Sequence, residues 1–126
     1  MQLAPHKRTL PGYHYDVTYR WRTSGGVFIA PKNMETRHLF HTLRMIWNNS
    51  MPKHMHVGRN IKYYSFGGFY TEEYMMRSVY HIFHELTKRN DLTEEQIREL
   101  ELMYSFLYSR LEHKPANLKV AHNNSP

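Results

Sequence analysis

The chain has 126 residues, a formal net charge of +6 and no cysteine. This length predicts one domain over residues 1–126 with a small core. The missing cysteine excludes a disulfide framework and a thiolate zinc site, and it is typical of the reducing cytoplasm. No run of about 18 apolar residues occurs, so no membrane span is expected. No apolar run follows the basic patch His6-Lys7-Arg8, so a secretory signal is not expected either.

The positive charge is concentrated in the first half of the chain. Residues 1–70 carry ten Lys/Arg and two acids, a net of +8, whereas residues 71–126 carry seven Lys/Arg and nine acids, a net of −2. Twelve of the eighteen aromatic residues also lie in the first half. A basic front half is expected where that half meets an anion, although many basic proteins have no such ligand. The aromatic residues either form the core of a small sheet or stack on bases.

Residues 1–12 are expected to form a flexible basic arm, because their prolines and glycine break regular structure. From Tyr13 to Arg22 two kinds of side chain alternate strictly, and a period of two over this length predicts a half-buried strand. Arg20 and Arg22 lie on its polar face. The aromatic face, assigned to the core, holds Tyr13, Tyr15, Tyr19 and Trp21.

A hairpin turn is predicted directly after this strand. Gly25-Gly26 supplies the positive φ that such a turn needs. Val27–Ala30 form the returning strand, and Pro31 ends it because proline cannot donate a ladder hydrogen bond. The front half therefore begins with an antiparallel ribbon.

The first helix is predicted to begin at Asn33 or Thr36 and to end near Trp47, before Pro52. Residues at helical spacing form an apolar stripe, which predicts one buried face. The stripe consists of Leu39, Phe40, Leu43, Ile46 and Trp47. Another face carries Arg37, His41, Arg44 and Asn48 at i, i+4, i+7 and i+11. A candidate ligand site is formed by His38 together with Arg37, His41 and Arg44.

The region between this helix and the back half is expected to be largely irregular. Asn48–Asn60 is predicted to be a basic loop with few residues suited to a core. Ile61–Tyr70 is rich in aromatic residues, which favours a strand pair or ribbon around Gly67-Gly68. The cations of this region that are candidates for ligand contact are Lys53, Arg59 and Lys62.

Residues 71–113 are predicted to form an antiparallel helical hairpin with a short linker. Thr71 caps the first helix, with acids in its first turn. Thr93-Glu94-Glu95-Gln96 is a capping box for the second helix, which is expected to stop before Pro115. The buried stripe of the first helix consists of Met75, Val79, Ile82, Phe83 and Leu86. Its last turn is basic, with Lys88 and Arg89. Residues 114–126 are expected to be a mobile tail.

The second helix of this pair carries two apolar sets. The first comprises Ile97, Leu100, Tyr104, Leu107 and Leu111, and the second comprises Leu102, Met103 and Phe106. One set packs on the preceding helix, while the other requires the sheet or another copy of the chain. We therefore predict a homo-oligomer; the alternative is a monomer whose core has three layers.

The ten histidines raise the question of a metal site. His38 and His41 are three residues apart, as are His81 and His84, so each pair shares a helix face. Two such pairs could hold one zinc ion with four imidazoles. No HExxH motif is present, and satisfied or solvent-facing histidines explain the same spacing. Neither a metal nor another cofactor is therefore predicted.

No catalytic motif is found elsewhere in the sequence. Serine lies in no Gly-x-Ser-x-Gly setting, no carboxylate pair suggests glycosidase chemistry, and neither Gly-Gly pair has a phosphate-loop pattern. A histidine and an arginine acting as general acid and electrophile are the one concrete enzymatic option. The sequence favours a binding protein over an enzyme without deciding between them.

Three short segments together form a recognisable pattern. In chain order they are Trp21-Arg22-Thr23-Ser24-Gly25-Gly26, Met34-Glu35-Thr36-Arg37-His38-Leu39 and Thr42-Leu43-Arg44-Met45. Over residues 21–47 this order resembles small uncharacterised phage and prophage accessory proteins, with a Trp-x-Thr strand, a Gly turn and a Met-x-Thr-x-His-Leu helix start. Glu85-Leu86-Thr87-Lys88-Arg89 extends the similarity.

The resemblance implies a phage accessory protein that acts in the host cytoplasm, in host takeover or counter-defence. Such a protein binds a host protein, a nucleic acid or a signalling nucleotide, and the family implies no activity. A purely structural interpretation stays open beside it. In that interpretation Met34 is a hydrophobic staple, Thr36 caps the helix and His38 bonds to a turn, so the motif is a folding signature.

We predict an α+β domain: an N-terminal antiparallel β-ribbon or small sheet packed on one helix, followed by a C-terminal helical hairpin. The predicted function is non-enzymatic binding of nucleic acid or of a phosphorylated or cyclic nucleotide through the basic face. Helix-turn-helix, zinc-finger and RNP motifs are lacking. Two alternatives stay open, a protein-binding inhibitor that docks on an acidic host surface and a small metal-dependent enzyme that uses the His-x-x-His pairs. The predicted ligand-binding residues are Arg20, Arg22, Arg37, His38, His41, Arg44, Lys53, Arg59 and Lys62.

Overall fold

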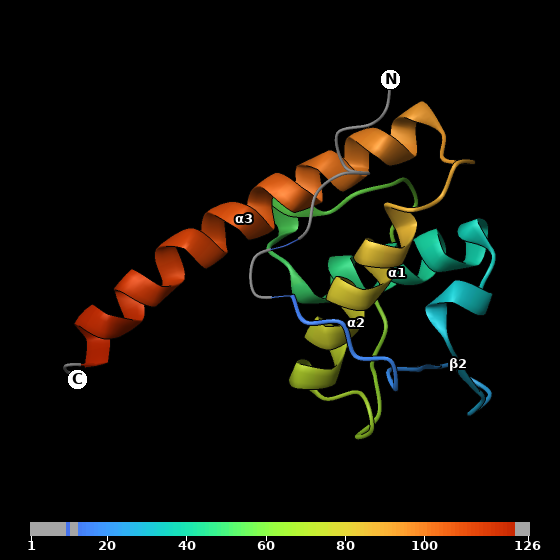
Figure 1. Cartoon of the computed structure of the whole chain (residues 1–126), viewed down its shortest axis with the longest axis horizontal. Helices are drawn as coiled ribbons and strands as arrows, with labels where there is room; N and C mark the ends of the chain where they lie inside the picture. Colours follow the sequence, from blue (N-terminus) through green and yellow to red (C-terminus); the bar gives the residue numbers. More distant parts are fainter. Residues whose placement is uncertain (1–9, 11–12, 123–126) are drawn as a thin grey trace.

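The computed structural model describes residue 10 and residues 13–122, with side chains through Arg110. Within these residues the chain forms one two-stranded hairpin and three long helices, whose arrangement can be followed in Figure 1. This confirms the α+β class. In chain order the elements are β1 (Trp21–Arg22), β2 (Phe28–Ile29), the 3-10 helix η2 (Pro31–Asn33), α1 (Thr36–Ser50), the 3-10 helix η3 (Lys53–Met55), α2 (Glu72–Leu86) and α3 (Glu94–His122). The flexible arm predicted for residues 1–12 lies outside the described residues, apart from Leu10, which is buried.

The strand predicted from Tyr13 to Arg22 is wrong for all but its last two residues. The Asp16 carboxylate accepts hydrogen bonds from the backbone N–H and the hydroxyl of Thr18, at 2.9 and 2.6 Å. This Asx-type turn bends the chain and prevents strand pairing. The alternation of buried and exposed side chains fails as well, since Tyr15 is 63% exposed whereas Tyr19 is buried.

The hairpin itself is short but has the predicted turn. β1 and β2 are antiparallel, with Trp21 opposite Ile29 and Arg22 opposite Phe28. Gly26 has a φ of 85°, which fits the requirement for glycine at this turn. The 3-10 helix η2 then leads the chain from the hairpin into α1.

The core is formed mainly by α1 and α2, the closest helix pair in the described part of the chain. Both predicted apolar stripes are buried. They consist of Leu39, Phe40, Leu43, Ile46 and Trp47 on α1, and Met75, Val79, Ile82, Phe83 and Leu86 on α2. The segment before β1 crosses the outer side of α2 (Figure 1), where Tyr19 stacks on His81 with ring centroids 4.5 Å apart.

α3 adds a third helix to this core. Leu100, Met103 and Leu107 are buried, and Phe106 packs edge-on against Trp47, with ring centroids 6.0 Å apart. Part of the second apolar set is therefore covered within one chain, while Leu102 of that set is 45% exposed. The helix does not stop before Pro115 but continues to His122, and Figure 1 shows its C-terminal part extending beyond the other elements.

The helix caps follow the sequence in the back half but not at α1. The Thr71 hydroxyl accepts from the Tyr74 N–H at 3.0 Å, and Thr93 and Gln96 form the reciprocal capping box at 2.9 and 3.1 Å. α2 ends at Leu86, before the basic residues expected in its last turn. Thr36 is inside α1 instead of capping it.

Two further predictions for the middle of the chain are wrong. The loop after α1 contributes Met51, Met55 and Val57 to the core. Residues 61–70 form no strand. Their aromatic side chains pack on one another and on the hairpin, so the residue types that favour a strand are used in side-chain contacts instead.

Candidate anion-binding groove

A hollow of about 230 Å³ lies between the outer face of α1 and residues 57–64. His41 and Arg44 line it from α1, and Arg59, Lys62 and Tyr64 line it from the segment opposite. A second, more open hollow adjoins it along α1. This second hollow shares His41 and Arg44 with the first and adds Arg37, His38 and Glu35. We call the two together the α1 groove.

Three side chains at the end of α1 hold the opposite wall in place. The Asn48 amide donates to the Val57 carbonyl and accepts from the Val57 N–H, both at 2.9 Å. The Trp47 Nε1–H donates to the Met55 carbonyl at 2.8 Å. Asn49 Oδ1 accepts from the Tyr64 N–H at 2.8 Å. Because these bonds satisfy backbone groups of an irregular segment, they fix its position beside α1.

Backbone conformation then turns Arg59 toward the groove. Gly58 has a φ of 91° and Asn60 has a φ of 52°, so the residues on both sides of Arg59 are left-handed. A Cβ at position 58 would come within 3.6 Å of the Arg44 side chain. The positive φ therefore favours glycine at position 58, whereas a Cβ there would meet Arg44 at an ordinary van der Waals distance.

Arg44 is the one groove arginine that already has a carboxylate partner among the described residues. Its Nε and Nη2 each lie 2.8 Å from an oxygen of Glu99 on α3. Its guanidinium also lies 5.0 Å from the centre of the Phe40 ring. Arg44 was predicted to bind a ligand, but in this structure most of its charge is compensated by Glu99.

The other five basic side chains of the groove, counting the histidines, have no such partner among the described residues. None of them forms a hydrogen bond or ion pair with a side chain in the described part of the molecule, and all are exposed. They are Arg37, His38, His41, Arg59 and Lys62. Such groups are available to phosphate or carboxylate oxygens of a ligand.

The remaining predicted site residues lie elsewhere. The Arg20 guanidinium donates to the carbonyls of Val17 and Tyr19, at 3.0 and 2.8 Å. The Arg22 guanidinium lies 5.0 Å from the centre of the Phe69 ring. Lys53 is exposed on η3 and lines neither hollow. The structure thus brings six of the nine predicted residues into one groove.

Sequence reasoning missed Tyr64 as a groove residue and Glu99 as the partner of Arg44. The aromatic density of residues 61–70 was the available signal for Tyr64. Glu99 follows the capping box by only a few residues, and its local sequence gives no sign of a partner on α1. The contact joins residues that are 55 positions apart.

The two histidine pairs do not meet. His38 and His41 lie on the exposed side of α1, whereas His81 and His84 face the segment before β1. His81 has both nitrogens occupied, since Nε2 accepts from the Asp16 N–H at 3.2 Å and Nδ1 lies 2.9 Å from the Arg77 carbonyl. Over the residues whose positions are described, no group of three or more His, Cys, Asp or Glu is placed to hold a metal ion.

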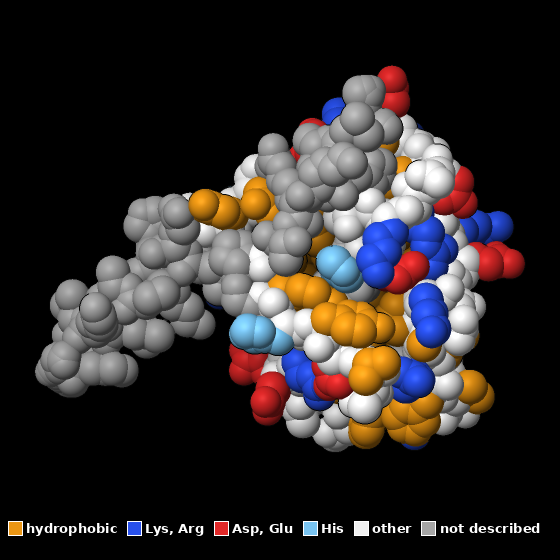
Figure 2. Space-filling model, viewed as in Figure 1, with side chains coloured by type: hydrophobic (Ala, Val, Ile, Leu, Met, Phe, Trp, Pro, Cys, Tyr) orange, Lys and Arg blue, Asp and Glu red, His pale blue; other side chains and the backbone are white. Residues whose placement is uncertain are grey.

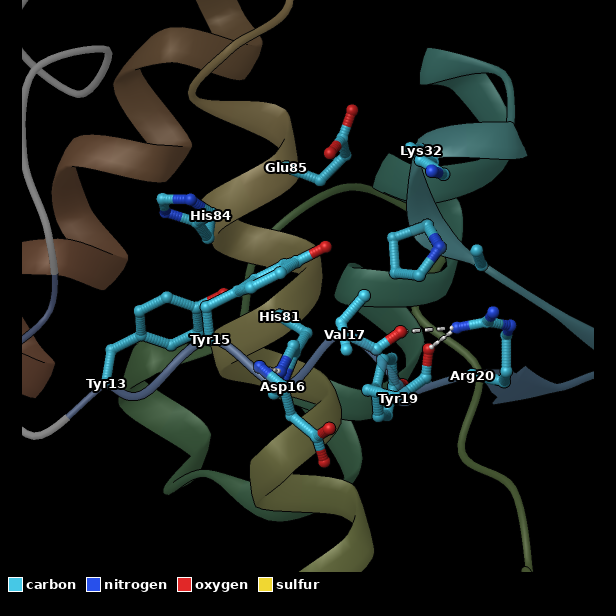
Figure 3. Close-up of a pocket in the computed structure, with 12 residues that line it drawn as sticks. Tyr13, Tyr15, Asp16, Val17, Tyr19, Arg20, Lys32, His81, His84 and Glu85 are labelled. Atoms are coloured by element: carbon cyan, nitrogen blue, oxygen red, sulfur yellow. Dashed lines mark hydrogen bonds between the residues drawn. The ribbon is translucent and has the colours of Figure 1, made fainter.

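A smaller hollow, of about 70 Å³, lies over α2 and is shown in Figure 3. Tyr15 lies across it, with Tyr13 and His84 on one side and Lys32 and Arg20 on the other. The Tyr13 ring stacks on His84 with ring centroids 4.7 Å apart. The Tyr13 hydroxyl and His84 Nδ1 are buried and have no hydrogen-bond partner among the described residues.

This burial shifts both groups toward their neutral forms. It lowers the pKa of His84, with a further contribution from nearby Lys88, and it raises the pKa of Tyr13 to about 12. Glu85, at the rim, is paired with Arg89 at 3.1 Å. Figure 2 shows side chains of both charge signs around apolar ones on this face, whereas the α1 groove is lined by basic side chains with Glu35 as the one acid.

The fold and the groove together define a small α+β protein with an unpaired basic surface on one helix. Comparison with protein-family models, with curated proteins and with solved structures finds no significant match. The resemblance to phage accessory proteins therefore stays a prediction. Within the described ranges, no helix is long and apolar enough to cross a membrane.

Proposed function

We propose that this is a non-enzymatic binding protein whose α1 groove takes a phosphate-bearing ligand, either a nucleic acid or a phosphorylated nucleotide. The observation that carries the proposal is that Arg59 and Lys62 line one hollow opposite His41, with Arg37 in the adjoining hollow. None of these side chains is paired with a carboxylate among the described residues. Glu35 is the single acid among the residues that line the two hollows. A surface of one charge sign attracts anions and raises their rate of association.

The residue types match the chemistry of phosphate. An arginine guanidinium offers two parallel N–H donors to one phosphate, while a lysine ammonium acts as a compact point charge. His38 and His41 each add an imidazole N–H donor. Because all of these side chains are exposed, binding is expected to weaken steeply as salt rises.

A non-enzymatic role is favoured by what lines the groove. Catalysis by a side-chain nucleophile requires that nucleophile to sit within hydrogen-bond reach of a base. Among the residues that line the two hollows, no serine, threonine or cysteine is present, and Lys62, His38 and His41 form no hydrogen bond with a described side chain that could act as a base. The groove residues are suited to holding an anion in place.

The test is the binding of a fluorescent oligonucleotide and of inorganic polyphosphate, followed by anisotropy over a range of salt concentrations. Arg59→Ala and Lys62→Ala should each weaken binding of both ligands, and each should reduce the slope of log K against log salt by about 1. Lys32→Ala is the matched control, because Lys32 is an exposed cation that lines neither hollow of the groove. Equal binding by the wild type, the two groove variants and the control would overturn the proposal.

A thermal-shift screen extends the test to small ligands. A mononucleotide or cyclic nucleotide that binds the groove should raise the melting temperature by mass action, and Arg59→Ala should reduce the rise. If the nucleotide raises the melting temperature of Arg59→Ala as much as that of the wild type, the nucleotide binds outside the groove.

The same surface supports one competing proposal, the docking of an acidic protein. Five unpaired groove side chains fit a carboxylate-rich surface as well as they fit phosphates. In a phage this would correspond to a host-takeover or counter-defence inhibitor. Two results together would favour this proposal. An acidic protein from host cells should co-purify with the wild type but not with Arg59→Ala, and the wild type should not bind polyphosphate.

A further inference from the structure

A continuous row of aromatic rings leads from the α1 groove to the hairpin. Tyr64, which lines the groove, has its ring centroid 6.3 Å from that of Phe66. Phe66 and Tyr70 are 5.4 Å apart, Tyr70 and Phe69 are 5.4 Å apart, and Phe69 and Phe28 are 5.7 Å apart. Four consecutive ring contacts therefore connect the groove to β2.

Much of this row is open to water. Tyr64 and Phe69 are each 44% exposed, and Phe28 is 54% exposed. Neighbouring Gly67 and Gly68 have no other atoms within 4 Å of the position that a Cβ would take. A contiguous patch of exposed aromatic side chains marks an interaction site more often than a single exposed aromatic residue does.

The row is held in place from both ends. The Tyr70 hydroxyl donates to the Arg22 carbonyl at 2.8 Å, and the Tyr74 hydroxyl donates to the Arg20 carbonyl at 2.7 Å. At the groove end, the Tyr64 N–H donates to Asn49 at 2.8 Å. The rings thus form a surface that exists before any ligand binds, which lowers the ordering cost of binding.

Cations flank the row. Arg59 and Lys62 line the groove at one end, and the Arg22 guanidinium lies 5.0 Å from the centre of the Phe69 ring at the other. Arg22 forms no ion pair with any side chain that the structure describes. A ligand that follows the row therefore meets positive charge at both ends and aromatic faces between them.

We propose that the ligand of the α1 groove is single-stranded nucleic acid, with phosphates on the flanking cations and bases stacked on the exposed rings of this row. The proposal rests on the phosphate-binding function proposed above and names its ligand class. Only unpaired bases present a free face for stacking on aromatic side chains. In a duplex those faces are covered by the neighbouring base pairs, and a single nucleotide uses only one ring of the row.

The test compares three labelled or competing ligands at fixed salt: oligothymidylate of about 12 nucleotides, a duplex of equal length, and inorganic polyphosphate. The single strand should bind at least about tenfold more tightly than the duplex, since stacking is available only to the single strand. Phe69→Ala and Phe28→Ala, at rings of the row that do not line the groove, should each weaken oligothymidylate binding about tenfold and leave polyphosphate binding unchanged. Tyr64→Ala should weaken oligothymidylate binding as well.

Two control variants isolate stacking from other effects. Tyr64→Phe keeps the ring and should recover most of the oligothymidylate affinity that Tyr64→Ala loses. Tyr15→Ala removes an aromatic side chain that is 63% exposed but lies outside the row, and it should also bind like the wild type. Thermal melting of each variant checks that these surface substitutions leave the fold intact.

The outcomes separate the two proposals. If Arg59→Ala weakens polyphosphate binding but the ring variants leave oligothymidylate binding unchanged, the groove binds phosphate and the single-strand proposal is overturned. Equal affinity for duplex and single strand overturns it as well. If Arg59→Ala alters the binding of no ligand, the phosphate-binding function itself is overturned.

Discussion

Arg44 on α1 and Glu99 on α3 face each other in a two-point ion pair, with Nε–Oε1 and Nη2–Oε2 distances of 2.8 Å. The Glu99 side chain is only 11% exposed, and that of Arg44 is 33% exposed. The pair joins two helices and also compensates one of the charges that line the α1 groove. Stability and anion affinity should therefore change in opposite directions when the pair is broken.

Glu99→Gln should lower the free energy of unfolding by about 1–3 kcal/mol, because a charged partner is removed from a largely buried hydrogen-bonded pair. It should also tighten polyphosphate binding, because the Arg44 charge is no longer compensated. Urea unfolding and anisotropy measure the two effects. Glu101→Gln, two residues further along α3, is the control and should change neither. If Glu99→Gln is less stable but binds polyphosphate more weakly, the Arg44 charge does not contribute to anion binding in the groove.

Asn48→Ala should destabilise the protein by about 2–4 kcal/mol, because it leaves both backbone polar groups of Val57 without their partner. The wall of the groove should then move away from α1, so oligonucleotide binding should weaken as well. Urea unfolding and anisotropy test this expectation. Asn33→Ala, at an exposed position on η2, should have little effect on either measurement.

Stability should fall as the pH drops below about 6.5, the ordinary pKa of histidine, because of His84. Burial lowers the pKa of His84 in the folded state, so the unfolded chain takes up the proton first. The stability that neutral His84 provides is present at pH 7 and is lost as the pH falls from 6.5 toward the folded-state pKa. The pKa of Asp16 is also lowered, by hydrogen bonds from Thr18, but its effect appears only below its ordinary value of 3.8.

Urea unfolding of His84→Gln between about pH 5 and pH 7 isolates this effect, because the variant cannot be protonated there. Its stability should vary less with pH than that of the wild type. His38→Gln removes an exposed histidine and leaves the half-buried His84 in place, so it should keep the pH dependence that His84 causes. If the stability of His84→Gln falls with pH as much as that of the wild type, another group causes the pH dependence.

Arg89→Lys should cost about 1–2 kcal/mol of stability, because a lysine cannot replace a planar guanidinium with several partners. Arg89 donates to Glu85, to the Thr36 hydroxyl and to the Pro31 carbonyl, each at 3.1 Å. It thereby links the end of α2 to the start of α1. Thermal or urea unfolding measures the loss, and Arg98→Lys at an exposed position on α3 should leave stability unchanged.

The helices were predictable because their signals are local. The apolar stripes of α1 and α2 repeat at helical spacing, and the capping hydroxyls of Thr71 and Thr93 lie within three residues of the groups they bind. The strand from Tyr13 failed for an equally local reason that the alternation concealed. Asp16 and Thr18 have the residue types of a turn, and their hydrogen bonds bend the chain before Trp21.

By itself the sequence determined the basic front half, the two buried helical stripes, the hairpin turn at Gly26 and the set of cations from which a binding surface is made. Only the tertiary structure decided which of those cations are free. It placed Arg59 and Lys62 opposite His41 through bonds from Asn48 and Asn49. It also paired Arg44 with a carboxylate from α3. Charge is a property of residue type, whereas its availability depends on contacts between residues that are distant in the chain.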